Sequence, residues 1–208
     1  MHSSSNSNQI PAQANGIVAS GHNIMKAYRL LILNKQGVLH SDQKSFSDNV
    51  FQAYQLLEKE HGSCGIKGFD LSKIARMLCI EYPQTVTQGI LQLLDKREDE
   101  NCDFEEFLSA IQTIFLYDSF FEEMLSIFHH IDNSKTGRVR LCDLSEAFSK
   151  LRASDVQPLH ELRVPESKDL EAVYKRLNNA GSIETSGSLT QAEFLMTMFK
   201  TTTEADEL

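Results

Sequence analysis

The sequence predicts an all-α protein in which paired helix–loop–helix units form two lobes. Three observations indicate this fold class. Apolar residues recur at helical spacing, polar or glycine-containing loops separate the helices, and the same pattern returns several times along the chain. A single helix–loop–helix unit cannot bury its apolar face alone, so we expect the units to pack in pairs.

The clearest unit extends from Phe120 to Leu151. Four apolar residues precede its loop and four follow it at i, i+3, i+4, i+7 spacing: Phe121, Met124, Leu125, Phe128, then Leu144, Ala147, Phe148 and Leu151. An EF-hand loop has oxygen-bearing side chains at positions 1, 3 and 5, glycine at 6, an apolar residue at 8 and a carboxylate at 12. Residues 132–143 supply Asp132, Ser134, Thr136, Gly137, Val139 and Asp143 at these positions. The loop therefore predicts an EF-hand-like shape.

The candidate metal ligands of this loop are Asp132, Ser134, Thr136, the main chain of Arg138, and Asp143. Its two acids are outnumbered by Lys135, Arg138 and Arg140, so a divalent cation enters a loop of net positive charge. The last ligand is an Asp, where calcium loops use a bidentate Glu. We expect a loop that kept its fold and lost most of its metal affinity, with calcium binding at low affinity left open.

The other three loops deviate further from the EF-hand pattern. Gly62–Lys73 has no opening acid and ends in a lysine. Asp95–Glu106 has acids at positions 1, 5, 9 and 12 (Asp95, Asp99, Asp103 and Glu106), but Arg97 stands at position 3 and Glu100 replaces the turn glycine. Ser182–Glu193 has Glu184, Ser186, Gly187, Leu189 and Glu193 at positions 3, 5, 6, 8 and 12 but lacks the opening Asp. Within each pair the position-8 residues should meet, which places Phe69 opposite Cys102 and Val139 opposite Leu189.

These units give a domain plan. We expect a disordered tail at 1–20, an N-terminal pair with a leading helix at 21–117, a C-terminal pair at 118–200 and a short tail at 201–208. Residues 153–165, with two prolines, form a linker inside the second pair.

Composition excludes several classes of function. The 208-residue chain has a net charge of −9 and no Lys/Arg cluster, so nucleic acid is not the expected ligand. We find neither a secretory leader nor an apolar run long enough to span a membrane, and therefore expect a cytoplasmic protein. The four cysteines lack metal or redox spacing and are interpreted as reduced and buried: Cys64, Cys79, Cys102 and Cys142.

No catalytic chemistry is indicated. The sequence assembles no nucleophile, base and orienting group, and contains no phosphate-binding glycine loop. His129 and His130 are adjacent on a helix, where side chains point about 100° apart, so the pair cannot face one ion. We expect a protein that is not an enzyme and that holds no cofactor.

Three segments resemble a known family. They are LCIEYPQTVTQ at 78–88, DFEEFLSAIQTIFLYDSFFEEM at 103–124 and LTQAEFLMTMFK at 189–200. They lie within residues 77–124 and 189–200, which together cover roughly a third of the chain. They are similar to the family of the centriolar satellite-associated tubulin polyglutamylase complex regulator. Their motifs are packing motifs, such as the proline before a helix.

This resemblance implies a non-catalytic adaptor or regulatory protein of the tubulin polyglutamylase complex, acting at microtubules, centriolar satellites or cilia. It implies protein partners among the subunits of that complex and transfers no catalytic residue to this chain. An acidic chain suits an adaptor that contacts a basic partner. The alternative is a calcium-binding EF-hand sensor that exposes an apolar groove to a target helix, as open EF-type lobes do.

Overall fold

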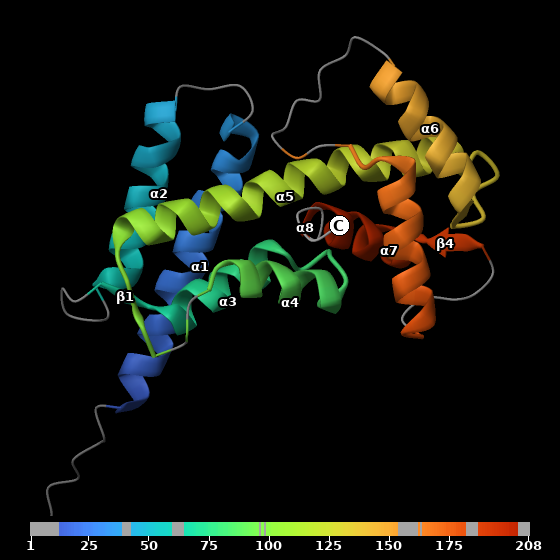
Figure 1. The fold of residues 1–208 in the computed structure, drawn as a ribbon. Coiled ribbons are helices and arrows are strands. Elements are labelled where there is room, and N and C mark those ends of the chain that lie inside the picture. Colours follow the sequence, from blue (N-terminus) through green and yellow to red (C-terminus); the bar gives the residue numbers. More distant parts are fainter. Residues whose placement is uncertain are drawn as a thin grey trace, which may run out of the picture. The chain divides into compact units, whose positions relative to one another are not determined.

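The computed structural model describes residues 13–38, 43–59, 65–95, 97, 99–153, 162, 164–181 and 187–203. Within these ranges the protein has eight helices and four strands of two or three residues (Figure 1). The predicted all-α fold class is confirmed. No helix in the described ranges is both long and apolar enough to cross a membrane. The chain divides into two compact units, Met1–Ile74 with Arg97–Leu108 and Ala75–Lys96 with Ser109–Leu208.

The first unit contains α1 (Gln13–Val38), α2 (Gln43–Glu58), β1 (Ile66–Lys67), β2 (Asn101–Cys102), most of α3 (Gly68–Leu78) and the first residues of α5 (Phe104–Ile131). Helices α1 and α2 pack side by side (Figure 1). Both contribute apolar residues at helical spacing to the buried core: Ile24, Ala27 and Leu31 from α1, and Val50, Ala53 and Leu57 from α2. Tyr54 adds ring contacts to Phe104 and Phe107 and donates a hydrogen bond to the Cys102 carbonyl at 3.2 Å.

The strand pairing of this unit corrects one prediction. Strands β1 and β2 are antiparallel, and Ile66, not Phe69, lies opposite Cys102. Phe69 sits on α3 with 52% of its surface exposed. The close approach of the chain before β1 to the main chain of Cys102 requires Gly65. Its φ is +80°, and an added Cβ there would lie 2.9 Å from the Cys102 carbonyl oxygen. The apolar position of the first loop is therefore three residues earlier than predicted.

The second unit contains the end of α3, α4 (Gln84–Leu93), most of α5, β3 (Arg138–Arg140), α6 (Leu141–Ala153), α7 (Ser167–Asn179), β4 (Ser188–Thr190) and α8 (Gln191–Thr203). Strands β3 and β4 are antiparallel with Val139 opposite Leu189, which confirms the second predicted contact. The largest fully buried side chains here are phenylalanines: Phe120, Phe121, Phe128, Phe148 and Phe194. The rings of Phe128 and Phe194 lie 5.2 Å apart, so α5 and α8 share this core.

Several element boundaries differ from the domain plan. Helix α5 runs without a break through the boundary expected at residues 117 and 118, because 104–131 contain neither glycine nor proline. Helix α1 begins at Gln13, inside the expected tail, and α8 continues to Thr203. Residues 1–12, 204–208 and 154–161 of the expected tails and linker lie outside the described residues.

The cysteines follow the prediction in part. Cys79 and Cys102 are free and buried, as expected of small apolar residues in a core. Cys142 is free but exposed, because it stands on the solvent side of the first turn of α6. Cys64 lies outside the described residues.

Candidate functional site

The loop between α5 and β3 is closed around the carboxylate of Asp132. Oδ1 accepts hydrogen bonds from the amide and the hydroxyl of Thr136, each at 2.9 Å, and from the Ser134 hydroxyl at 3.4 Å. Oδ2 accepts the Gly137 amide at 2.7 Å. Gly137 has a φ of +73°, the left-handed conformation that the turn glycine of an EF-hand loop supplies. The loop therefore supplies the donors for its own first carboxylate.

These donors also set the ionisation of Asp132. Desolvation raises the pKa of this nearly buried carboxyl, but the amides of Thr136 and Gly137 and the two hydroxyls outweigh it, so the pKa lies below its ordinary value. At neutral pH Asp132 is therefore the anion that the loop is built to hold.

The last carboxylate of the loop has a different partner. Arg140 Nε donates to Asp143 Oδ2 at 2.8 Å and Nη2 donates to Oδ1 at 2.7 Å, a two-pronged ion pair at the start of α6. The guanidinium holds the pKa of Asp143 below its ordinary value through hydrogen bonding and charge. Both oxygens that a metal would need at position 12 are thus bonded to a cation from the same loop.

The strand pair fixes the far side of the loop. Arg138 Nε donates to the Ser188 hydroxyl at 3.0 Å, and the Leu141 amide donates to the Gly187 carbonyl at 3.1 Å. The Gly187 amide donates to the Tyr174 hydroxyl at 3.1 Å, which connects the start of β4 to α7. The loop is thereby bonded to β4 and, through Gly187, to α7.

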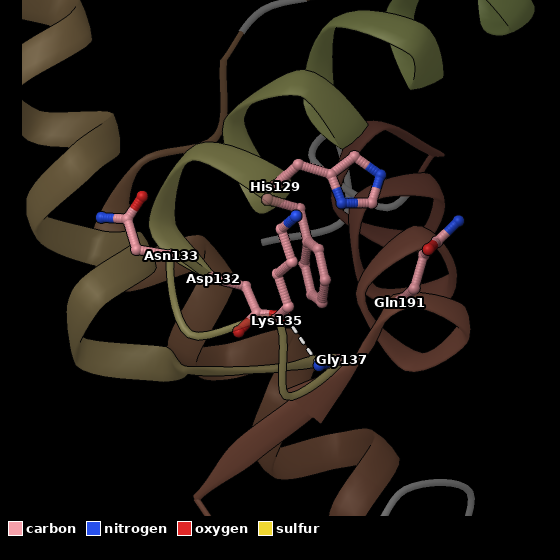
Figure 2. A pocket seen from close by; sticks show the side chains of 7 residues that line it. His129, Asp132, Asn133, Lys135, Gly137 and Gln191 are labelled. Carbon is pink, nitrogen blue, oxygen red and sulfur yellow. Dashed lines mark hydrogen bonds between the residues drawn. The ribbon is translucent and has the colours of Figure 1, made fainter.

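A pocket of about 410 Å³ opens beside this loop (Figure 2). Its lining residues come from the end of α5 and the loop, with Gln191 across from them at the start of α8. Those from α5 and the loop are Phe128, His129, Asp132, Asn133, Lys135 and Gly137. His129 and His130 are both exposed, and the His129 ring meets the Phe128 ring edge at 5.8 Å. The pocket thus has an apolar wall and a polar, partly cationic rim.

In the two other paired loops, the position-12 acid closes a helix end. Glu106 accepts the Asp103 amide at 3.0 Å and gives its own amide to Asp103 Oδ1 at 2.9 Å, a reciprocal cap at the start of α5. Glu193 accepts the Thr190 amide at 2.7 Å and the Thr190 hydroxyl at 2.8 Å at the start of α8. Both carboxylates therefore cap helices, in the reciprocal arrangement of a capping box.

The five predicted ligands are therefore only partly brought together. Asp132, Ser134 and Thr136 converge, and the Arg138 carbonyl oxygen lies 3.2 Å from the Thr136 hydroxyl, but Asp143 is bonded to Arg140. As arranged, this donor set does not fit a calcium shell. Within the described residues no group of three or more His, Cys, Asp or Glu side chains is placed to hold a metal. Glu184 and Ser186 of the fourth loop lie outside those residues.

Sequence reasoning missed a second polar site in the same unit. The Tyr82 hydroxyl donates to Asp118 Oδ1, and the Cys79 thiol lies nearby, where burial and the charge of Asp118 raise its pKa to about 12. Burial and the bond to Asp118 also raise the pKa of Tyr82. Tyr82 and Asp118 are far apart in sequence and lack a local motif. The Arg140–Asp143 pair, by contrast, has i, i+3 spacing that the sequence displays.

The fold and this site define an all-helical protein in which one helix–loop–helix unit is joined to a second by a two-stranded contact, with loop carboxylates held by the chain's own donors. A family model matches residues 19–203, described as tubulin polyglutamylase complex subunit 1-like, C-terminal. The chain belongs to this family, and the suspected relationship to tubulin polyglutamylase proteins is confirmed. The family name relates the chain to the tubulin polyglutamylase complex and, through tubulin, to the cytoskeleton. No curated protein and no solved structure matches the chain.

Proposed function

We propose that this chain is a non-catalytic adaptor of the tubulin polyglutamylase complex, built on degenerate EF-hand-like pairs. The observation that carries the proposal is the family match, which extends over residues 19–203 and so includes both units. The chain's place is with the other subunits of that complex, at microtubules, centriolar satellites or cilia.

The EF-hand-like part of the proposal is supported by the geometry around β3 and β4. Gly137 adopts a positive φ at position 6, and Val139 pairs with Leu189 at the two position-8 sites. The same loop argues against a calcium sensor, because Arg140 occupies both oxygens of Asp143. In a calcium sensor the ion would have to replace Arg140 on the Asp143 carboxylate. The loop's surplus of basic residues repels the ion and opposes this replacement.

The non-catalytic part is supported by what the acidic side chains do. Asp132 closes a loop, Asp143 binds an arginine, and Glu106 and Glu193 cap helices. Acids that make structural hydrogen bonds in this way are poor general bases, because proton transfer to them would break the bonds that hold a helix end or a loop. A role in presenting surfaces to partners leaves these hydrogen bonds in place.

Purified components test this proposal. Polyglutamylase complex is isolated from ciliated cells depleted of this chain, and labelled glutamate incorporation into tubulin is measured with the complex, with the chain and with both. We expect the chain alone to transfer no glutamate, to co-elute with the complex and to change its rate or its retention on microtubules. Glutamate transfer by the chain alone would refute the non-catalytic assignment. Failure to co-elute would refute the adaptor assignment.

A further inference from the structure

Helix α1 presents an apolar and basic stripe to solvent. Six of its side chains are exposed and share one face, which we call the α1 stripe: His22, Met25, Lys26, Arg29, Ile32 and Leu33. Their spacing of three or four residues places them on successive turns of one side. Leu33 is 77% exposed, Met25 42% and Ile32 37%. The opposite side of the helix is the buried face with Ile24, Ala27 and Leu31.

Helix α1 is therefore apolar on two sides. A surface helix that buries one stripe normally turns charged and polar residues to solvent on the other, and a helix that is apolar around its circumference is normally covered. Within the described residues, α2 covers one side only. The α1 stripe thus has the composition of a contact surface, with three apolar side chains beside two cations.

The charge of this region differs from that of the whole chain. The net charge is −9, yet residues 1–41 contain no Asp or Glu, so all 29 acidic residues lie beyond them. The same residues carry Lys26, Arg29 and Lys35. The acidic chain as a whole favours a basic partner, but the α1 stripe is a local exception that favours an acidic one.

We propose that the α1 stripe docks an acidic amphipathic helix of a protein partner, with apolar side chains between Met25, Ile32 and Leu33 and carboxylates on Lys26 and Arg29. From residue 22 to residue 33 the stripe extends roughly 17 Å along the axis, which matches about three turns of a partner helix. This inference rests on the proposed adaptor function in one respect only, because it assigns the partner to a subunit of the same complex.

A nucleic acid or an anionic bilayer suits the stripe less well. The stripe carries only two cations other than histidine, Lys26 and Arg29, whereas the whole chain has a net charge of −9. This net negative charge disfavours a long polyanion, because its length beyond the stripe meets an acidic protein. A polyanion extends past the stripe in every direction, whereas a helix of three turns ends where the stripe ends. A second copy of this chain is the remaining occupant, and it is an outcome of the test below.

The first test uses synthetic probes and the full-length chain. Three fluorescent peptides are compared by anisotropy: a helical peptide with a leucine stripe flanked by glutamates, the same peptide with lysines for glutamates, and polyglutamate. We expect the glutamate–leucine helix to bind about tenfold more tightly than either other peptide. Equal binding of the two helices, binding of polyglutamate as tight as that of the helix, or no binding by any peptide would overturn the inference.

Variants locate the binding to the stripe. Lys26→Glu with Arg29→Glu, and Met25→Ser with Leu33→Ser, should each abolish the preference while circular dichroism stays unchanged, since these side chains are exposed. The matched controls are the exposed cations of α3, Lys73→Glu with Arg76→Glu, and the exposed apolar residues Ile80→Ser with Leu93→Ser. Loss of the preference in a control but not in a stripe variant would place the site elsewhere.

The second test separates the inference from the proposed function. A photo-crosslinking amino acid replaces Leu33 in full-length chain bound to the polyglutamylase complex, and the crosslinked peptide is sequenced by mass spectrometry. An acidic helical segment of another subunit is the expected product. Crosslinks to lipid, to nucleic acid or to a second copy overturn the inference and leave the adaptor function standing. Absence of any complex subunit from the sample contradicts the adaptor function, while the peptide preference still decides the inference.

Discussion

The contact between Gly89 on α4 and Phe199 on α8 makes a quantitative prediction. A Cβ added at Gly89 would overlap the ring carbons Cε1 and Cζ of Phe199, whose side chain is only 3% exposed and has little room to turn. Gly89→Ala gains about 1 kcal/mol of helix propensity. It costs ~1–3 kcal/mol through overpacking. We expect a net loss of about 1 kcal/mol in the free energy of unfolding.

The measurement is urea and thermal denaturation of Gly89→Ala and wild type, each followed by circular dichroism because the chain has no tryptophan. A loss of this size lowers Tm by roughly 2–4 °C in a chain of this length. Gly21→Ala on α1 is the matched control, since nothing lies within 4 Å of its added Cβ. It should stabilise the protein by ~0.5–1 kcal/mol.

A double-mutant cycle tests the cause. In a Phe199→Leu background the ring edge is removed, so Gly89→Ala should become neutral or stabilising there. If Gly89→Ala in the otherwise wild-type chain raises Tm as much as Gly21→Ala, the packing of α4 on α8 is not as tight as the structure has it. The reasoning would then be refuted.

Four further predictions concern the loop at 132–143 and the cysteines. Calorimetric titration of chelator-stripped protein should give no saturable heat at micromolar calcium; heat that saturates there and vanishes in Asp132→Ala would establish a sensor. Arg140→Ala frees Asp143 and removes a cation, so millimolar calcium binding should strengthen severalfold, and unchanged binding would show that the arginine is not the obstacle. Asp132 and Asp143 have pKa values in the folded protein below their ordinary ones. They therefore stabilise the protein above the unfolded pKa of about 4, and this stability is lost as pH falls through the folded pKa values. Asp132→Asn should therefore make the free energy of unfolding less dependent on pH in that window. Thiol titration should lose a fast phase in Cys142→Ser and keep it in Cys79→Ser, because only the former is exposed.

Local patterns predicted the parts of this protein that depend on local chemistry. Helical spacing located most helices, and the glycine at position 6 located the turn at Gly137. Counting from that turn also gave the Val139–Leu189 register. Each of these follows from a few neighbouring residues, which is why the sequence displays them.

The sequence predictions were wrong or incomplete where contacts between residues far apart in the chain determine the structure. In the first loop Ile66 and Phe69 are both apolar and three residues apart, so spacing alone does not choose between them; the choice depends on Gly65 fitting against the Cys102 carbonyl. The bond from Tyr82 to Asp118 joins residues 36 positions apart, and no motif precedes it. The reciprocal caps of Glu106 and Glu193 were visible in the spacing but were interpreted as metal positions, since a carboxylate suits both roles.

The carboxylate of Asp132 meets four donors that come from the next five residues of the chain. In domains that close around a metal, folding waits until the ion arrives, and chelators undo it. Here the groups that complete the turn are synthesised together with the carboxylate they satisfy. The loop can therefore close as soon as the ribosome has released it, at whatever ion concentration the surroundings provide.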